Sequence, residues 1–229
     1  MNAYFLSILQ GTLVSVSVAL VSLCISVLLG LLVAAASLSN NRFFSALALG
    51  YSTVLRGIPE LVLMLLMFYG GTMGLNYLLQ AAGSPSSIDI NPFLAGVLTL
   101  GLVYGAYMSE TFRGAILSIP AGQAEAARAF GMNERQTFIR IILPQMIRYA
   151  LPGFSNNWLV LIKATALVSL IGLQDMTYLA RQASAATRQP FIFLIFTGAL
   201  FLLLTSVSLW VLRKLNDRYS LGTRQVVLL

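Results

Sequence analysis

The first 41 residues contain no charged side chain, and residues 9–36 form one long apolar run. A helix of about 20 predominantly apolar residues crosses the hydrocarbon core of a membrane, where every backbone N–H and C=O must be paired within the segment. Four further runs have the required length and character: residues 59–82, 92–117, 150–172 and 191–212. The sequence therefore predicts an all-α integral membrane protein with about five transmembrane helices.

Composition agrees with this prediction. Only 9% of the 229 residues are charged and 58% are hydrophobic, whereas a soluble domain carries roughly 25% charged residues. No Lys or Arg precedes the first run, which is also too long for the core of a signal peptide. We therefore expect residues 9–36 to remain in the protein as its first span. The segment 43–55 is compatible with an interfacial helix or with the first part of a broken span.

The basic residues predict the orientation, because cytoplasmic loops of membrane proteins are enriched in Lys and Arg. With the N-terminus outside and the C-terminus inside, the segments 37–58 and 118–149 and the tail 213–229 are cytoplasmic. Those regions and their flanks hold 11 of the 14 basic residues: Arg42, Arg56, Arg113, Arg128, Arg135, Arg140, Arg148, Arg213, Lys214, Arg218 and Arg224. The opposite orientation would reverse this bias.

Several function classes are excluded by residues that the chain lacks. It has no histidine and one cysteine, Cys24, which removes Ser-His-Asp catalysis, Cys-His catalysis and any histidine metal site. Neither lysine lies in a GxxxxGK phosphate loop, so we expect no ATPase site and no cofactor in this chain. Five spans without an evident internal repeat are few for a self-contained carrier, and the chain looks like half of a transporter.

The segment 118–149 is unusual because six charged residues lie within 24 positions of an otherwise apolar chain. Its alanine-rich part predicts a helix over 121–130. Gly131 suits the left-handed position that closes a helix, and Asn133 with Gln136 forms a capping-box pair for a second helix. We expect Pro144 to end that second helix. The pattern predicts two short helices at an angle on the cytoplasmic side.

The spacing within this segment matches a known motif at every position. Glu-Ala-Ala is followed after three residues by Gly, after nine more by Ile, and after one more by Leu-Pro: Glu125, Ala126, Ala127, Gly131, Ile141, Leu143 and Pro144. This resembles the EAA motif of the permease subunits of bacterial ABC importers. Three stretches resemble the polar amino-acid branch of these permeases, the histidine-permease (HisMQ) type: LRGIPELVLMLLMFYG (55–70), GAYMSETFRGAILSIPAGQAEAA (105–127) and LPGFSNNWLVLIKATALVSLIGLQD (151–175). The first and the third are most similar to its Q-type subunit.

The resemblance implies a type I ABC importer permease fold over residues 9–212, in the bacterial inner membrane. It further implies a second permease subunit (a paralogue or an identical copy), two cytoplasmic ATPases that bind the ATP and Mg²⁺, and a periplasmic amino-acid-binding protein. The substrates implied are cationic amino acids or opines. In this family the EAA loop is the coupling helix that contacts the ATPase, which assigns that role here to Glu125, Ala126, Ala127, Arg128 and Gly131.

Ionisable residues within spans are costly and are functional candidates by default. Glu110 and Arg113 are three residues apart and Arg56 and Glu60 are four apart, so each acid has a local partner as the structural alternative. Lys163 has no acid near it in sequence, and could neutralise a carboxylate of another span or orient the substrate's carboxylate. Together with Glu60, Glu110 and Lys163, four polar residues are candidates for lining a path for the substrate across the membrane: Asn156, Asn157, Thr165 and Ser169. The structural alternative for the Ser and Thr residues is that their hydroxyls donate to backbone carbonyls of their own helix.

Other functions remain as alternatives at this stage. A permease for neutral or acidic polar amino acids would share the same fold and motif. A secondary transporter has no ATPase to contact, so it would have no reason to carry the complete EAA motif. A membrane-embedded enzyme would need a cluster of catalytic polar side chains, which the sequence of the spans does not indicate.

Overall fold

The computed structural model describes residues 2–84 and 86–219, and every regular element in this part of the chain is helical. The order is α1 (Asn2–Ser37), α2 (Arg42–Gly57), α3 (Glu60–Leu65), the π-helical η1 (Leu66–Gly70), α4 (Gly71–Ala81), α5 (Pro92–Leu117), α6 (Ala121–Ala129), α7 (Glu134–Thr137), the π-helical η2 (Phe138–Ile142), α8 (Leu143–Ala164), the 3₁₀-helical η3 (Thr165–Ile171), α9 (Met176–Thr187) and α10 (Pro190–Tyr219). The predicted all-α class is confirmed.

Within the described residues, five helical segments are long and apolar enough to cross a membrane, and each overlaps one of the predicted spans. They are Asn2–Ser37, Glu60–Ala81, Pro92–Leu117, Glu134–Ile171 and Pro190–Tyr219. Of the tail predicted over 213–229, residues 213–219 are the last turns of α10, and the rest lies outside the described residues.

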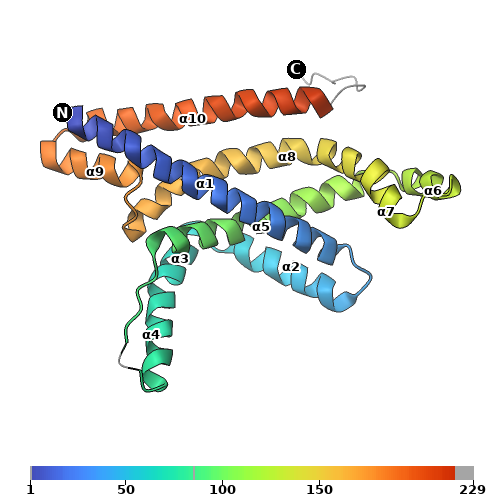
Figure 1. Ribbon diagram of the computed structural model, residues 1–229, viewed down its shortest axis with the longest axis horizontal. Helices are drawn as coiled ribbons and strands as arrows, with labels where there is room; N and C mark the ends of the chain where they lie inside the picture. Colours follow the sequence, from blue (N-terminus) through green and yellow to red (C-terminus); the bar gives the residue numbers. More distant parts are fainter. Residues whose placement is uncertain (1, 85, 220–229) are drawn as a thin grey trace.

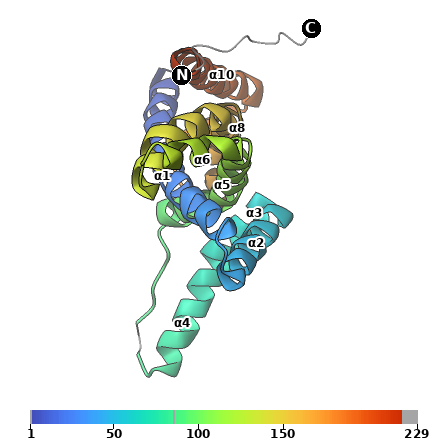
Figure 2. The same ribbon diagram turned by 90° about the vertical axis from the view of Figure 1, so that its right-hand side faces the viewer.

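The helices form an elongated bundle around α5 (Figure 1). Helices α1 and α8 run beside α5, and α10 lies on the outer side of α1 and α8. The short helices α6 and α7 extend from one end of the bundle, while α4 projects sideways from it in both views (Figures 1 and 2). The main core lies where α1, α5, α8 and η3 meet, and its fully buried members include Val18, Leu100, Tyr104, Leu161 and Val168.

Small residues allow α1 and α5 to approach closely. The buried positions of α1 recur at helical spacing and are nearly all small: Gly11, Ser15, Ala19, Ser22, Ser26, Gly30 and Ala34. Two of these serines donate hydrogen bonds across the contact, Ser22 to the carbonyl of Val97 at 3.4 Å and Ser26 to the carbonyl of Gly101 at 3.2 Å. Side chains of this size let helix backbones pack tightly in lipid, where dispersion and interhelical hydrogen bonds replace the hydrophobic driving force.

Residues 43–55 lie in helix α2. It runs back from the turn after α1 and packs against both α1 and α5 through a face that buries Ala48 and Ser52 (Figure 1), a packing that both an interfacial helix and the first part of a broken span allow. The Tyr51 hydroxyl donates to the carbonyl of Leu102 at 2.6 Å, and Ser52 and Ser109 share a hydrogen bond of 3.1 Å. Arg56, which belongs to the predicted cytoplasmic segment 37–58, lies in the last turn of this helix.

Pro144 does not end the second helix of the 118–149 segment, contrary to the sequence prediction. The chain continues from α7 through η2 into α8, with Pro144 in the first turn of α8. A proline ring clashes with the carbonyl four residues earlier in a regular α-helix, and the π-helical turn just before it changes that spacing. The side-chain amide of Gln145 donates to the carbonyl of Ile141 at 2.9 Å, which pairs a backbone acceptor at this irregularity.

A buried carboxylate fixes the other end of the bundle. Asp175 is fully buried and caps α9 by accepting a hydrogen bond from the Tyr178 N–H at 2.8 Å. Its second oxygen accepts from the Ser15 hydroxyl of α1 at 3.4 Å. Burial raises the pKa of Asp175, while these hydrogen bonds favour the ionised form.

The close contact of α1 with α5 predicts that glycine-to-alanine substitutions at two positions change the stability of the protein in opposite directions. A Cβ atom at Gly30 would lie 2.7 Å from the Cβ of Met108, whereas one at Gly114 of α5 would meet nothing within 4 Å. Overpacking costs about 1–3 kcal/mol, and alanine gains about 0.5–1 kcal/mol over glycine in a helix. We expect Gly30→Ala to lower the thermal aggregation midpoint of the detergent-purified protein and Gly114→Ala to preserve or raise it. Equal midpoints for the two variants would contradict this packing.

Candidate functional site

The segment between α5 and α8 is an ordered turn of two helices. Gly131 adopts a φ of +81°, a left-handed conformation that glycine reaches without the penalty of a β-carbon. The Asn133 side chain then accepts from the N–H of Gln136 at 2.9 Å, and the Gln136 side chain accepts from the N–H of Asn133 at 3.1 Å. The predicted helix-closing glycine and capping box are both confirmed.

An ion pair joins the two helices. Arg128 of α6 donates to both oxygens of Glu134 at the start of α7, at 2.7 and 3.1 Å. Hydrogen bonding to this carboxylate raises the pKa of Arg128. Both side chains are more than half exposed, so the pair adds little to global stability; its bidentate geometry links α6 to the start of α7.

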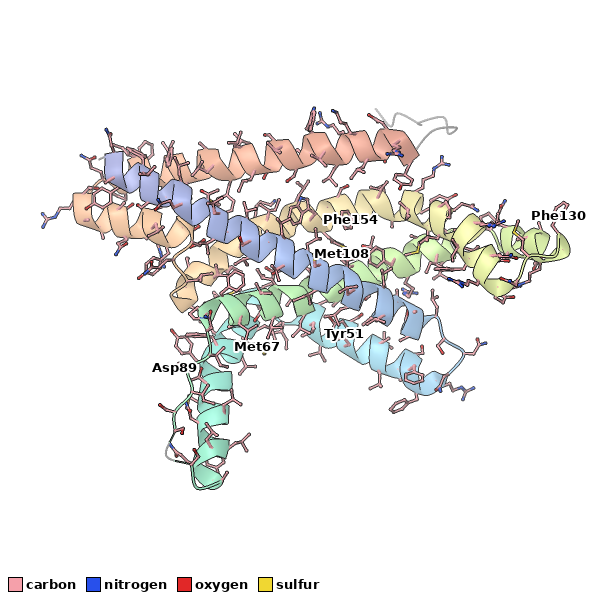
Figure 3. All side chains as sticks on the ribbon, viewed as in Figure 1. Tyr51, Met67, Asp89, Met108, Phe130 and Phe154 are labelled. Atoms are coloured by element: carbon pink, nitrogen blue, oxygen red, sulfur yellow. The ribbon has the colours of Figure 1, made fainter. Side chains whose placement is uncertain are left out.

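The remaining loop residues divide between inner and outer faces. Ala127 is buried, whereas Glu125, Ala126 and Ala129 are exposed. Phe130, at the tip of the loop (Figure 3), is 87% exposed. The sequence prediction did not include Phe130; the signal available was a large apolar residue directly before a helix-closing glycine. The tip of the loop thus presents the aromatic side chain of Phe130 beside small side chains, Ala126 and Ala129, and the charged side chains of Glu125 and Arg128.

A polar cleft lies between α2 and α5. It is lined by Leu49, Ser52, Thr53, Arg56, Gly57, Tyr107, Glu110 and Arg113, and we call it the α2/α5 cleft. The predicted pair is present: Arg113 donates to Oε2 of Glu110 from Nη2 at 2.8 Å and from Nε at 3.2 Å. Arg56 approaches the other oxygen, Oε1, at 4.0 Å, and its guanidinium lies 5.4 Å from the centre of the Tyr107 ring.

The expected Arg56–Glu60 pair is not formed. Helix α2 ends at Gly57 and α3 begins at Glu60, so the four-residue spacing crosses a break and does not place both side chains on one helical face. Glu60 instead accepts a hydrogen bond from the Tyr104 hydroxyl at 2.9 Å. The rings of Tyr104 and Tyr107 are 5.9 Å apart, which connects Glu60 to the α2/α5 cleft along one face of α5.

The candidates on α8 and η3 are not brought together in the same way. The Asn157 amide donates to the Thr111 hydroxyl of α5 at 3.0 Å. Thr165 and Ser169 donate to carbonyls of their own helix, Ile162 at 2.7 Å and Ala166 at 2.8 Å, the structural alternative considered for them. Asn156 and Lys163 are exposed, and Lys163 forms no ion pair with any residue in the described part of the chain.

Comparisons with known proteins agree with this fold. The family described as "Binding-protein-dependent transport system inner membrane component" matches residues 26–220. The histidine/lysine/arginine/ornithine transport system permease protein HisQ of Salmonella typhimurium is 50% identical over 218 residues, 95% of each chain. The octopine transport system permease protein OccQ of Rhizobium radiobacter is 41% identical over 219 residues, 96% of this chain and 92% of the relative.

Solved structures give the same picture. The crystal structure of an amino acid ABC transporter with histidines matches with a TM-score of 0.81 at 30% identity, covering 95% of this chain and 96% of that one. An inward-facing structure of the MetNI methionine ABC transporter matches with a TM-score of 0.72 at 16% identity, covering 98% and 100%, which supports the fold alone. This chain belongs to the family of binding-protein-dependent transport system inner membrane components.

Proposed function

We propose that this chain is the permease subunit of an ATP-driven importer of cationic amino acids, and that the 118–149 segment couples it to the ATPase. The observation that supports this proposal most directly is the α6–α7 turn, which extends from one end of the bundle (Figure 1) and exposes Phe130 at its tip. An exposed aromatic residue beside small side chains suits insertion into a pocket of a partner protein. The internal Arg128–Glu134 pair and Gly131 would keep the turn rigid enough to transmit movement.

The proposed assembly divides the work among several subunits. Two cytoplasmic ATPases bind ATP and Mg²⁺, a periplasmic binding protein delivers the amino acid, and a second permease, identical or paralogous, completes the path. In this chain Glu125, Ala126, Ala127, Arg128 and Gly131 form the coupling surface. Glu125 and Ala126 are exposed and would contact the ATPase directly. Ala127 is buried and would support that surface from beneath.

Cationic substrates are supported by two independent observations. The HisQ relative is named for histidine, lysine, arginine and ornithine, and the OccQ relative for octopine. Two carboxylates, Glu60 and Glu110, lie half-buried at the α5 face, where a cation would find a partner outside bulk water. The residues assigned to the path are Glu60, Glu110, Asn156, Asn157, Lys163, Thr165 and Ser169.

The orientation that accompanies this function is N-outside and C-inside. In a Cys24→Ser background, we expect cysteines at Ser87 and Ala185 to react with a membrane-impermeant thiol reagent in spheroplasts. A cysteine at Asn133 should react only after the membrane is permeabilised. Labelling of the Asn133 position in sealed spheroplasts would reverse the proposed topology.

Coupling is tested at the positive-φ glycine. In Gly131→Val, a β-branched side chain in the left-handed conformation costs about 1–2 kcal/mol, so the α6–α7 angle should change. We expect substrate-stimulated ATP hydrolysis by the reconstituted transporter to fall several-fold while the complex still assembles. Gly122→Val is the matched control, because Gly122 has no positive φ and open space around it. Full coupling in Gly131→Val, or an equal loss in both variants, would rule out this role.

Substrate class is tested by competition. In cells that express the complete transporter, lysine, ornithine and histidine should each compete with labelled arginine, whereas glutamine and glutamate should not, because neither adds a cationic side chain for Glu60 or Glu110. Uptake should stop in an ATPase-inactive variant of the partner. Equal competition by glutamine would reassign the substrate, and uptake that follows an ion gradient without ATP hydrolysis would refute the importer itself.

A further inference from the structure

An open pocket of about 360 Å³ lies between α8 and α10, which pack side by side along the bundle (Figure 1). We call it the α8/α10 pocket. It lies where two predicted spans end, since the fourth span begins at residue 150 and the fifth ends at residue 212. None of the residues proposed for the substrate path is among those that line it: Leu151, Pro152, Ser155, Leu209, Leu212, Arg213, Asn216 and Asp217.

The α8/α10 pocket is polar at one end and apolar at the other. Along α10, Leu209 and Leu212 precede Arg213 and Asn216, so the polar side chains lie toward the cytoplasmic end in the proposed orientation. Leu202 lies two turns before Leu209 on the same face of α10, and it is 67% exposed. An apolar surface therefore continues from the pocket toward the centre of the membrane. This arrangement fits a ligand with a polar head and an apolar chain.

Positive charge exceeds negative charge at the polar end. The last turns of α10 contain three basic residues and one acid: Arg213, Lys214, Arg218 and Asp217. The ammonium nitrogen of Lys214 lies 3.7 Å from the centre of the Trp210 ring. Trp and basic side chains at the end of a span are typical of the membrane–water interface, where the phosphates of lipids lie. The excess of positive charge favours a lipid with a net negative head group over a zwitterionic one.

The pocket also has a backbone acceptor beside it. Pro152 stands inside α8, and a proline has no N–H to donate to the carbonyl four residues earlier, which is that of Arg148. This carbonyl therefore lacks its regular helical partner next to a pocket whose other polar groups include the Ser155 hydroxyl and the Asn216 amide. Hydroxyl and phosphate groups of one head group would be complementary to this set of acceptors and donors.

We propose that the α8/α10 pocket binds an anionic phospholipid. Arg213 and Asn216 donate to its phosphodiester, for which the planar guanidinium fork is well suited. The carbonyl of Arg148 accepts from a head-group hydroxyl, and one acyl chain lies along Leu209 and Leu202. The cytoplasmic leaflet follows from the proposed N-outside, C-inside orientation, whereas the site itself depends neither on that orientation nor on the transported substrate.

The test places a photoreactive benzophenone amino acid at Leu209 in the complete permease–ATPase complex. The complex is reconstituted in nanodiscs with equal amounts of anionic phosphatidylglycerol and zwitterionic phosphatidylcholine, and mass spectrometry of this chain counts the two lipid adducts. The same amino acid at Val211, which is exposed on another face of α10, reports the surrounding lipid. We expect the ratio of phosphatidylglycerol to phosphatidylcholine adducts to be about fivefold higher at Leu209, the contribution of one basic side chain near an anionic surface.

Two variants separate the pocket from general attraction to a basic helix. Arg213→Gln should lower the adduct ratio at Leu209 to the ratio found at Val211. Arg218→Gln is the matched control, because it makes the same charge change on the same helix at a residue that does not line the pocket. It should leave the ratio at Leu209 as in the wild type.

Each other outcome overturns the proposal. Equal ratios at Leu209 and Val211 in the wild type would mean that the pocket holds only surrounding lipid. An unchanged ratio in Arg213→Gln, or an equal loss in Arg218→Gln, would refute a specific role for Arg213. A crosslink from Leu209 to another protein chain would show that a partner subunit covers the pocket.

A further variant decides the matter if Arg213→Gln fails to assemble. Ser155→Phe fills the pocket without changing its charge, so the ratio at Leu209 should again fall to that at Val211, and an unchanged ratio would refute the site. These readouts require no transport, so the lipid site and the proposed function can fail independently.

Discussion

The close contact between α1 and α5 is the constraint on which the rest of the structure depends. Without a hydrophobic driving force between helices in lipid, association relies on tight packing and on hydrogen bonds between helices. Gly30 leaves no room for even one methyl group beside Met108, and Ser26 bonds directly to the backbone of α5. At the far end of α1, Gly11 packs against the backbone of α9 beside buried Asp175. Small side chains thus hold α1 along the length of the bundle.

Because α1 fixes α5 on one side, the other faces of α5 are free to carry function. One face receives α2 and builds the cleft around Glu110. Another receives α8, where Gly153 fits against Thr111 and Asn157 bonds to the same threonine hydroxyl. Since α6 follows α5 after a short turn and α7 continues into α8, the exposed loop is attached to two helices of the core. The loop and the cleft are therefore joined through α5, which carries Glu110 and ends just before the loop.

Much of the candidate site could be predicted where the determinants are local. Gly131, the Asn133–Gln136 capping box and the Glu110–Arg113 pair each depend on residues three or four apart, whose geometry the helix or its end dictates. Arg56 and Glu60 have the same spacing, yet the break at Pro59 separates them. Glycines of similar spacing differ likewise: a Cβ at Gly101 would clash with Ile25 of α1, and one at Gly105 with Tyr51 of α2, whereas Gly74 has open space.

The sequence by itself determined the helical class, the number and approximate limits of the spans, and the α6–α7 turn, because each follows from backbone satisfaction in lipid and from contacts within a few residues. Only the tertiary structure decided that α2 packs against α1 and α5, that α7 runs through Pro144 into α8, and that Arg56 approaches Glu110 while Glu60 meets Tyr104. These outcomes depend on which faces of distant helices come together. The pattern of hydrophobicity along so apolar a chain does not indicate which helix faces pack together. Close packing of small residues and buried hydrogen bonds between helices determine that pairing.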